Sequence, residues 1–161
     1  MKIYQFKRTQ LLPIRLDETW DFFSSPQNLV KITPARMNFR ILHHPGTAMH
    51  AGQIIHYKVK VLPVYTVKWI TEITQVNKPF HFVDEQRLGP YSFWHHEHHF
   101  KEVPGGVEMT DEVSYSIPLG WIGQLANRFY VHRELCSLFD YRHAVLENLF
   151  GKMEPRITEP T

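Results

Sequence analysis

The chain has 161 residues, of which 43% are hydrophobic and 14% aromatic, and its formal net charge is +2. This length and composition predict one globular domain and exclude a disordered chain. The small, dispersed charge gives no electrostatic footprint for nucleic acid, and polar residues interrupt every apolar run, so no membrane insertion is expected. The single cysteine, Cys136, excludes an internal disulfide, and without an export signal a cytoplasmic protein is predicted.

The first elements are predicted from local signals. Residues 2–12 indicate a strand that is stopped by Pro13. We expect Asp17 to cap a short helix that ends before residue 25. A second short helix is expected at Pro26–Lys31, because proline fits the first turn of a helix.

The central part of the chain is predicted to form a β-sheet. Between residues 38 and 118 the hydrophobic period is two, and proline and glycine turn signals separate six predicted strands. The predicted arrangement is an antiparallel meander with a charged outer face. Alternation places on the inner face Ile55, Tyr57, Val59, Val61, Val67, Trp69, Thr71, Ile73, Phe82, Asp84, Gln86, Trp94, His96, His98, Phe100, Met109, Asp111, Val113, Tyr115 and Ile117.

After Gly120 the period becomes helical and persists to Phe150, a length of roughly 45 Å that would cover a sheet. The apolar stripe shifts by about a third of a turn along this segment, so a kink or break is expected near His132. We predict a single domain at residues 1–151 and a mobile tail at 152–161.

This order of elements resembles the START-like (SRPBCC) superfamily, which includes pollen-allergen, lipid-transfer, aromatase/cyclase and CoxG-like proteins. The segments similar to a bacterial ligand-binding branch are Trp20-Asp21-Phe22-Phe23, Asn28-Leu29 with Ile32-Thr33-Pro34, Trp69 with Thr71-Glu72-Ile73-Thr74, Phe82-Val83-Asp84-Glu85-Gln86, Gly89-Pro90-Tyr91 with Trp94-His95-His96 and His98, and Phe139-Asp140-Tyr141-Arg142. The resemblance implies an α+β helix-grip fold, in which a curved seven-stranded antiparallel sheet, two short helices and a long C-terminal helix enclose a cavity.

A histidine-rich string lies in the strand around residue 97. Alternation directs His96 and His98 inward, and it directs His95, Glu97 and His99 toward water. An inward pair could ligate a metal together with a neighbouring carboxylate, but two hydrogen-bonded pocket histidines are the simpler interpretation. The sequence therefore predicts no metal and no cofactor.

Turn lengths predict the partners of these histidines. They place Asp84 opposite His96, and they place Asp111 opposite Phe100 and diagonal to His98. Two acid–imidazole pairs would then line one wall, and these four residues are the candidate catalytic groups. Polar anchors for a ligand and a satisfied buried network are the alternatives.

Arg142 lies in the middle of the apolar stripe of the long helix, where an unpaired charge is unfavourable. We expect it to reach the cavity and pair with an acidic side chain or a ligand anion; the alternative is that its guanidinium reaches water. The full set of predicted ligand-binding residues is Tyr57, Trp69, Asp84, Gln86, Trp94, His96, His98, Asp111, Tyr115 and Arg142.

Binding or carriage of a small hydrophobic or aromatic ligand with one polar end is the predicted function, because the inner face mixes bulky apolar residues with a few polar ones. The alternatives are a cyclase- or dehydratase-type enzyme that uses the pocket His/Asp pairs, and a protein-interaction adaptor. The sequence is compatible with a homodimer as well as a monomer, and with binding alone as well as a reaction.

Overall fold

The computed structural model describes residues 2–46, 48–62 and 65–153. The elements in chain order are β1 (Tyr4–Leu12), α1 (Leu16–Phe23), α2 (Pro26–Lys31), the 3-10 turn η1 (Ala35–Met37), β2 (Arg40–His43), β3 (Gln53–Leu62), β4 (Tyr65–Asn77), β5 (His81–Leu88), β6 (Phe93–Val103), β7 (Gly106–Ser116), α3 (Gly120–Ala126), the π-helical segment η2 (Asn127–Val131) and α4 (His132–Phe150). The predicted tail lies almost wholly outside the described residues.

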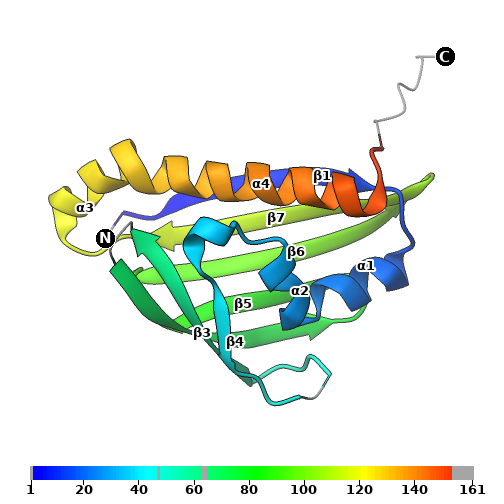
Figure 1. Ribbon diagram of the computed structural model, residues 1–161, viewed down its shortest axis with the longest axis horizontal. Coiled ribbons are helices and arrows are strands. Elements are labelled where there is room, and N and C mark those ends of the chain that lie inside the picture. Colours follow the sequence, from blue (N-terminus) through cyan, green and yellow to red (C-terminus); the bar gives the residue numbers. More distant parts are fainter. Residues whose placement is uncertain (1, 47, 63–64, 154–161) are drawn as a thin grey trace.

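The strands form one seven-stranded antiparallel sheet in the order β1-β7-β6-β5-β4-β3-β2. Helix α4 runs along this curved sheet, and α1 and α2 lie near the end at which α4 finishes (Figure 1). At that end the rings of Phe22 and Phe150 are 5.0 Å apart. The α+β helix-grip architecture predicted from the sequence is therefore confirmed. Among the described residues, no helix has the length and hydropathy needed to span a bilayer.

The start of α1 differs from the prediction. The capping position is Arg15, not Asp17, and the helix begins at Leu16. Glu18 accepts a hydrogen bond from the Arg15 backbone N–H at 3.1 Å, which fixes the first turn. Asp17 lies inside that turn, where its charge complements the helix dipole.

The register between β6 and β7 also corrects one prediction. Asp84 pairs with His96 as expected, but Asp111 pairs with His98 and not with Phe100. The reason is a two-residue turn at Pro104-Gly105, in which Gly105 has φ +96° as a type II turn requires. This turn is centred one residue earlier than expected, which moves every partner by two positions.

The predicted break in the long helix is confirmed. A π-helical segment, η2, separates α3 from α4 and ends immediately before His132. A π-helical turn contains more residues than an α-helical turn, so the side chains on its two sides face different directions. Gly151, at φ +98°, ends α4 directly after Phe150, where the helical period of the sequence also stops.

Two aromatic clusters flank the middle of β6. At one end Phe100 packs with Trp20 and Phe82, and at the other Trp94 packs with Phe139 and Val113. The stretch between Trp94 and Phe100 is polar, and its inward side chains lie between the two clusters. The sheet therefore presents a polar strip inside an otherwise apolar interior.

Candidate functional site

A cavity of about 540 Å³ lies between the sheet, helices α1 and α2, and the segment from α3 to α4. Such a volume falls in the range of roughly 300–1,000 Å³ typical of small-molecule sites. Its walls are mostly apolar. The lining residues are Phe22, Phe23, Ser25, Pro26, Asn28, Leu29, Ile32, Thr33, Met37, Phe39, Met49, Ile55, Tyr57, Val59, Val61, Tyr65, Trp69, Thr71, Ile73, Phe82, Asp84, Pro90, Tyr91, Trp94, His96, His98, Ile117, Leu119, Ala126, Tyr130, Val131, Glu134, Leu135, Leu138 and Arg142.

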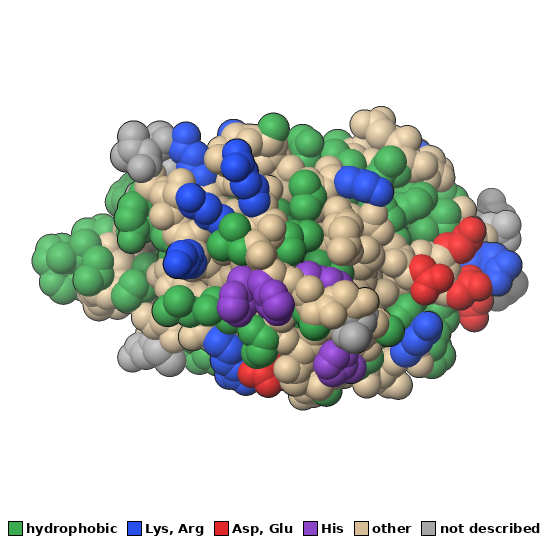
Figure 2. Space-filling model, turned by 60° about the horizontal axis from the view of Figure 1, so that its bottom comes forward, with side chains coloured by type: hydrophobic (Ala, Val, Ile, Leu, Met, Phe, Trp, Pro, Cys, Tyr) green, Lys and Arg blue, Asp and Glu red, His purple; other side chains and the backbone are tan. Residues whose placement is uncertain are grey.

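One end of the cavity reaches the surface beside α3. Leu119, which lines the cavity, is 75% exposed, and Trp121 and Phe129 nearby are also exposed. Figure 2 shows hydrophobic side chains gathered at the end of the molecule where Figure 1 places α3. An apolar ligand would therefore meet an apolar rim before it enters the cavity.

Four side chains on β5, β6 and β7 form a ring of alternating acids and imidazoles, which we call the His/Asp quartet: Asp84, whose side chain is 19% exposed, and the buried His96, His98 and Asp111. Nε2 of His96 lies 2.8 Å from Oδ1 of Asp111, and Nε2 of His98 lies 2.8 Å from Oδ2 of Asp84. The second nitrogen of each ring lies 3.3 Å and 3.1 Å, respectively, from the other carboxylate. The hydrogen bonds are diagonal to the strand register, so the quartet ties all three strands together.

Electrostatics in the quartet favour ion pairs. Burial alone would lower the pKa of His96, but the carboxylates of Asp84 and Asp111 outweigh it and raise that pKa to about 9. Burial likewise opposes ionisation of the two carboxyl groups, yet the adjacent imidazoles hold the pKa of Asp84 and of Asp111 well below the usual range. At neutral pH, His96 is therefore a cation and both carboxylates are ionised.

Arg142 adds a second cation to this wall. Its side chain comes from α4, is 7% exposed and lines the cavity. Nη1 lies 4.0 Å from Oδ1 of Asp111, and the guanidinium stacks over the Phe139 ring at 4.7 Å. Burial lowers the pKa of Arg142, but its intrinsic basicity keeps it charged. Its Nε is buried and has no hydrogen-bond partner among the described residues, so the hydrogen bonding of this guanidinium is incomplete.

Seven of the ten predicted ligand-binding residues line the cavity: Tyr57, Trp69, Asp84, Trp94, His96, His98 and Arg142. The other three support it from outside. Gln86 hydrogen-bonds the backbone N–H and carbonyl of Tyr91 and so shapes the β5–β6 turn. Asp111 lies behind the histidines, and the hydroxyl of Tyr115 donates to Asn127 at 2.9 Å, anchoring η2.

Tyr57 and Tyr91 bring phenol rings to the cavity. Burial raises the pKa of both, and the Asp84 carboxylate adds to the effect at Tyr57, so both remain neutral phenols. Tyr91 could not be predicted to line the cavity, because it follows a turn and lies outside the strand alternation. The same holds for Glu134 and Leu138 of α4, since the rotational phase of that helix depends on η2.

Asp84, His96 and His98 each offer a possible metal ligand atom, and these atoms lie within 4.8 Å of one another. A cation at this position would need unprotonated imidazoles, whereas His96 is held in its charged form. Arg142 already supplies a further positive charge to the same wall. The quartet therefore fits a network of ion pairs better than a metal centre.

Comparisons with known proteins show the fold alone. No family model matches the chain, and no curated protein gives a significant match. Among solved structures, protein CV1439 from Chromobacterium violaceum has a TM-score of 0.71 at 9% identity, covering 92% of this chain and 99% of that one. Protein Ms6760 from Mycobacterium smegmatis has a TM-score of 0.64 at 16% identity, covering 92% and 98%. TTHA0849 from Thermus thermophilus has a TM-score of 0.66 at 10% identity, covering 91% and 99%.

Proposed function

We propose that this chain is a START-like binding protein, which sequesters or carries a small, mainly hydrophobic ligand whose polar end carries a carboxylate or a carbonyl group. The observation that carries the proposal is the buried, incompletely hydrogen-bonded guanidinium of Arg142, a residue that lines an apolar cavity of about 540 Å³. A buried charge without full hydrogen bonding is costly, and a ligand acceptor beside the guanidinium would reduce that cost.

The lining of the cavity supports one orientation of the ligand. Apolar side chains from the sheet and from α1 and α2 would surround the hydrophobic body. The polar end would point to the wall that holds Arg142, His96 and His98. Arginine binds carboxylates through two parallel hydrogen bonds, and this geometry favours an acid over an alcohol of the same length.

The test uses matched ligand pairs that differ only in the polar end, such as medium-chain fatty acids against the corresponding alcohols, and aromatic acids against their alcohols. Isothermal titration calorimetry and thermal denaturation report affinity and stabilisation. We expect the acids to bind more tightly and to raise the melting temperature more. Absence of binding across both series, together with native mass spectrometry that finds no co-purifying molecule, would refute the proposal.

Acid–base catalysis is a second candidate function, favoured by one observation: His96 and His98 both line the cavity, and each lies between two carboxylates. Such pairs supply the proton donors and acceptors that a cyclase or dehydratase needs. Replacing each histidine with glutamine separates the two functions. A carrier would lose affinity only, whereas an enzyme would lose turnover of a bound substrate. No specific observation favours the adaptor role.

A further inference from the structure

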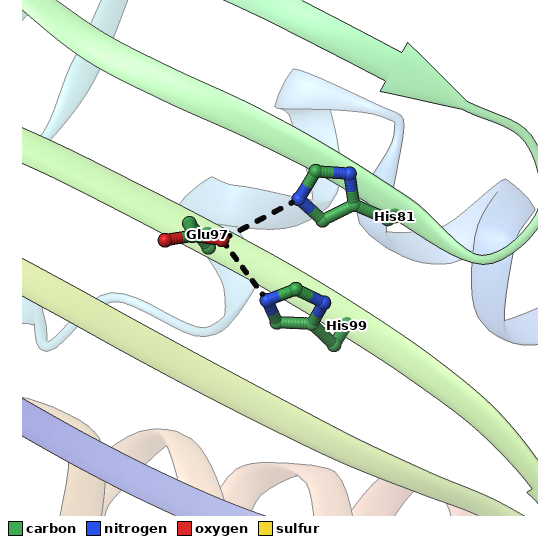
Figure 3. A group of neighbouring side chains, drawn as sticks. All are labelled: His81, Glu97 and His99. Carbon is green, nitrogen blue, oxygen red and sulfur yellow. Dashed lines mark ion pairs between the residues drawn. The ribbon is translucent and has the colours of Figure 1, made fainter.

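A second group of ionisable side chains lies on the opposite, outer face of the sheet, away from the cavity. It consists of His81 at the start of β5 and of Glu97 and His99 on β6 (Figure 3). His81 and His99 are direct partners in the strand register, and Glu97 precedes His99 by two residues, on the same face. The backbone of two paired strands thus fixes the positions of all three.

The three donor atoms converge on one point. Nε2 of His81 lies 3.7 Å from Oε2 of Glu97, and Nε2 of His99 lies 3.2 Å from the same oxygen. Zinc binds imidazole nitrogen at about 2.0–2.1 Å and carboxylate oxygen at about 2.0–2.2 Å, so a tetrahedral site separates its ligand atoms by about 3.4 Å. The two separations from Glu97 bracket that value, and all three ligand atoms lie within 4.8 Å of one another.

One of these donors has no partner without an ion. Nε2 of His81 is buried and has no hydrogen-bond partner among the described residues, since 3.7 Å is too long for one. The His81 and His99 rings stack at 4.6 Å, which limits their rotation and keeps both nitrogens directed at Glu97. A cation between the three groups would satisfy the buried nitrogen.

The surroundings suit a partly open site. His95 reaches the other oxygen of Glu97 at 3.4 Å, and its own Nδ1 lies 2.7 Å from Glu85, so the carboxylate is held from behind. The His99 side chain is 42% exposed and that of Glu97 is 35% exposed. Water can therefore complete the coordination from the solvent side.

We propose that His81, Glu97 and His99 form a site for a divalent transition metal ion, with Zn²⁺ as the best-matched ion. Two imidazoles and one carboxylate are a donor set that zinc uses with a water in the fourth position. The site is independent of the proposed function, because its side chains and the cavity lie on opposite faces of β6.

The experiment titrates the untagged full chain, freed of metal by a chelator, with Zn²⁺ at neutral pH by isothermal titration calorimetry. The variants are H81Q and H99Q, and H50Q is the matched control, since it removes an exposed histidine outside the site. We expect one equivalent of zinc, a rise in melting temperature on binding, and a loss of affinity of more than about tenfold in H81Q and H99Q but not in H50Q. Mg²⁺ should not compete, because it prefers oxygen ligands.

Imidazole NMR resonances provide a readout that does not depend on the variants. Zinc should shift the signals of His81 and His99 in the unmodified chain, and should leave those of His96 and His98 in place. The proposal is wrong if zinc does not bind, if H99Q binds zinc as the unmodified chain does, or if only the His96 and His98 signals respond. Should H81Q fail to fold, H99Q decides, since the side chain that it replaces is 42% exposed.

Discussion

Nε2 of His96 lies 2.8 Å from Oδ1 of Asp111, and both side chains are almost completely buried. The same oxygen of Asp111 also lies 3.1 Å from Nδ1 of His98 and 4.0 Å from Nη1 of Arg142. One carboxylate on β7 therefore joins side chains from β6 and α4. It holds the polar wall of the cavity together without forming part of that wall.

Replacing Asp111 with asparagine should therefore destabilise the protein strongly. The change keeps the shape of the side chain but leaves His96 and Arg142 short of a counter-charge inside the protein. Removing one partner of a buried ion pair typically costs about 3–5 kcal/mol. Urea denaturation measures the free energy of unfolding. Asp140, whose side chain is 64% exposed and pairs with Arg8, provides the control: D140N should cost about 1 kcal/mol or less. Equal costs for D111N and D140N would contradict this account.

Stability should fall as the pH rises from neutral to alkaline. The pKa of His96 is raised from the usual 6.5 to about 9, so its contribution is complete below 6.5 and is lost as the pH rises through about 9. The full effect is on the order of 3 kcal/mol, because one pKa unit corresponds to about 1.4 kcal/mol. Chemical denaturation of the unmodified chain and of H96Q, measured between pH 6.5 and about 9, isolates the contribution of His96 to stability. The difference between the two should shrink with rising pH, and a constant difference would disprove the assignment.

At acid pH, protonation of the two carboxyl groups of the quartet should also lower the stability of the protein. The pKa values of Asp84 and Asp111 are lowered from the usual 3.8, so their contributions are present above that pH and are lost as the pH falls far below it. The protein should retain these ion pairs at pH values where ordinary carboxylates are already protonated. NMR titration of the Asp84 and Asp111 carboxyl carbons checks this directly. Titration midpoints near 3.8 would show that the imidazoles do not lower the pKa values of these carboxyl groups.

R142Q should reduce selectivity for acidic ligands. Glutamine keeps a hydrogen-bond donor near the cavity but removes the charge. Hydrogen bonds to charged groups contribute about 1.5–3 kcal/mol, so affinity for an acid should fall about 10- to 100-fold. The matched alcohol should bind nearly as before, because its contacts are apolar. If acid and alcohol lose affinity equally, Arg142 supports the structure and does not bind the ligand.

G123A should disturb the helix at the mouth of the cavity. A Cβ atom on Gly123 would lie 2.0 Å from the carbonyl oxygen of Pro118, and backbone atoms cannot yield easily. We expect a loss of about 1–3 kcal/mol in the free energy of unfolding, measured by urea denaturation. Q124A, at the exposed next position, should change stability by less than about 0.5 kcal/mol. Similar stabilities for the two variants would mean that α3 repacks freely.

Much of the cavity wall could be predicted because alternation in a strand is a strict rule. It placed Tyr57, Trp69, Trp94, His96 and His98 at the cavity without any knowledge of the partners of each strand. The same rule cannot give register, which depends on the length of each turn. One residue of error at the turn after β6 moved the predicted partner of Asp111 from His98 to Phe100.

Contacts between distant segments were the part that sequence could not supply. The outer face of β6 was predicted to face water, and its meeting with His81 follows only from the pairing of β5 with β6. Arg142 was expected to reach the cavity because a charge interrupts an apolar stripe. Its approach to Asp111 depends on how α4 crosses the sheet, which no local pattern specifies.

The segment from Trp94 to Phe100 reads nearly the same in both directions, so its five central polar residues do not distinguish one register of β6 from another. The aromatic residues at its two ends, Trp94 and Phe100, do distinguish the correct register from the others. A slip by one residue would expose both rings, at a cost of about 1.5–3 kcal/mol each, and would exchange the inner and outer polar groups. Trp94 and Phe100 thus determine which histidines face the interior, and mutations at either residue should disturb the register of β6 and, with it, the polar contacts of these histidines.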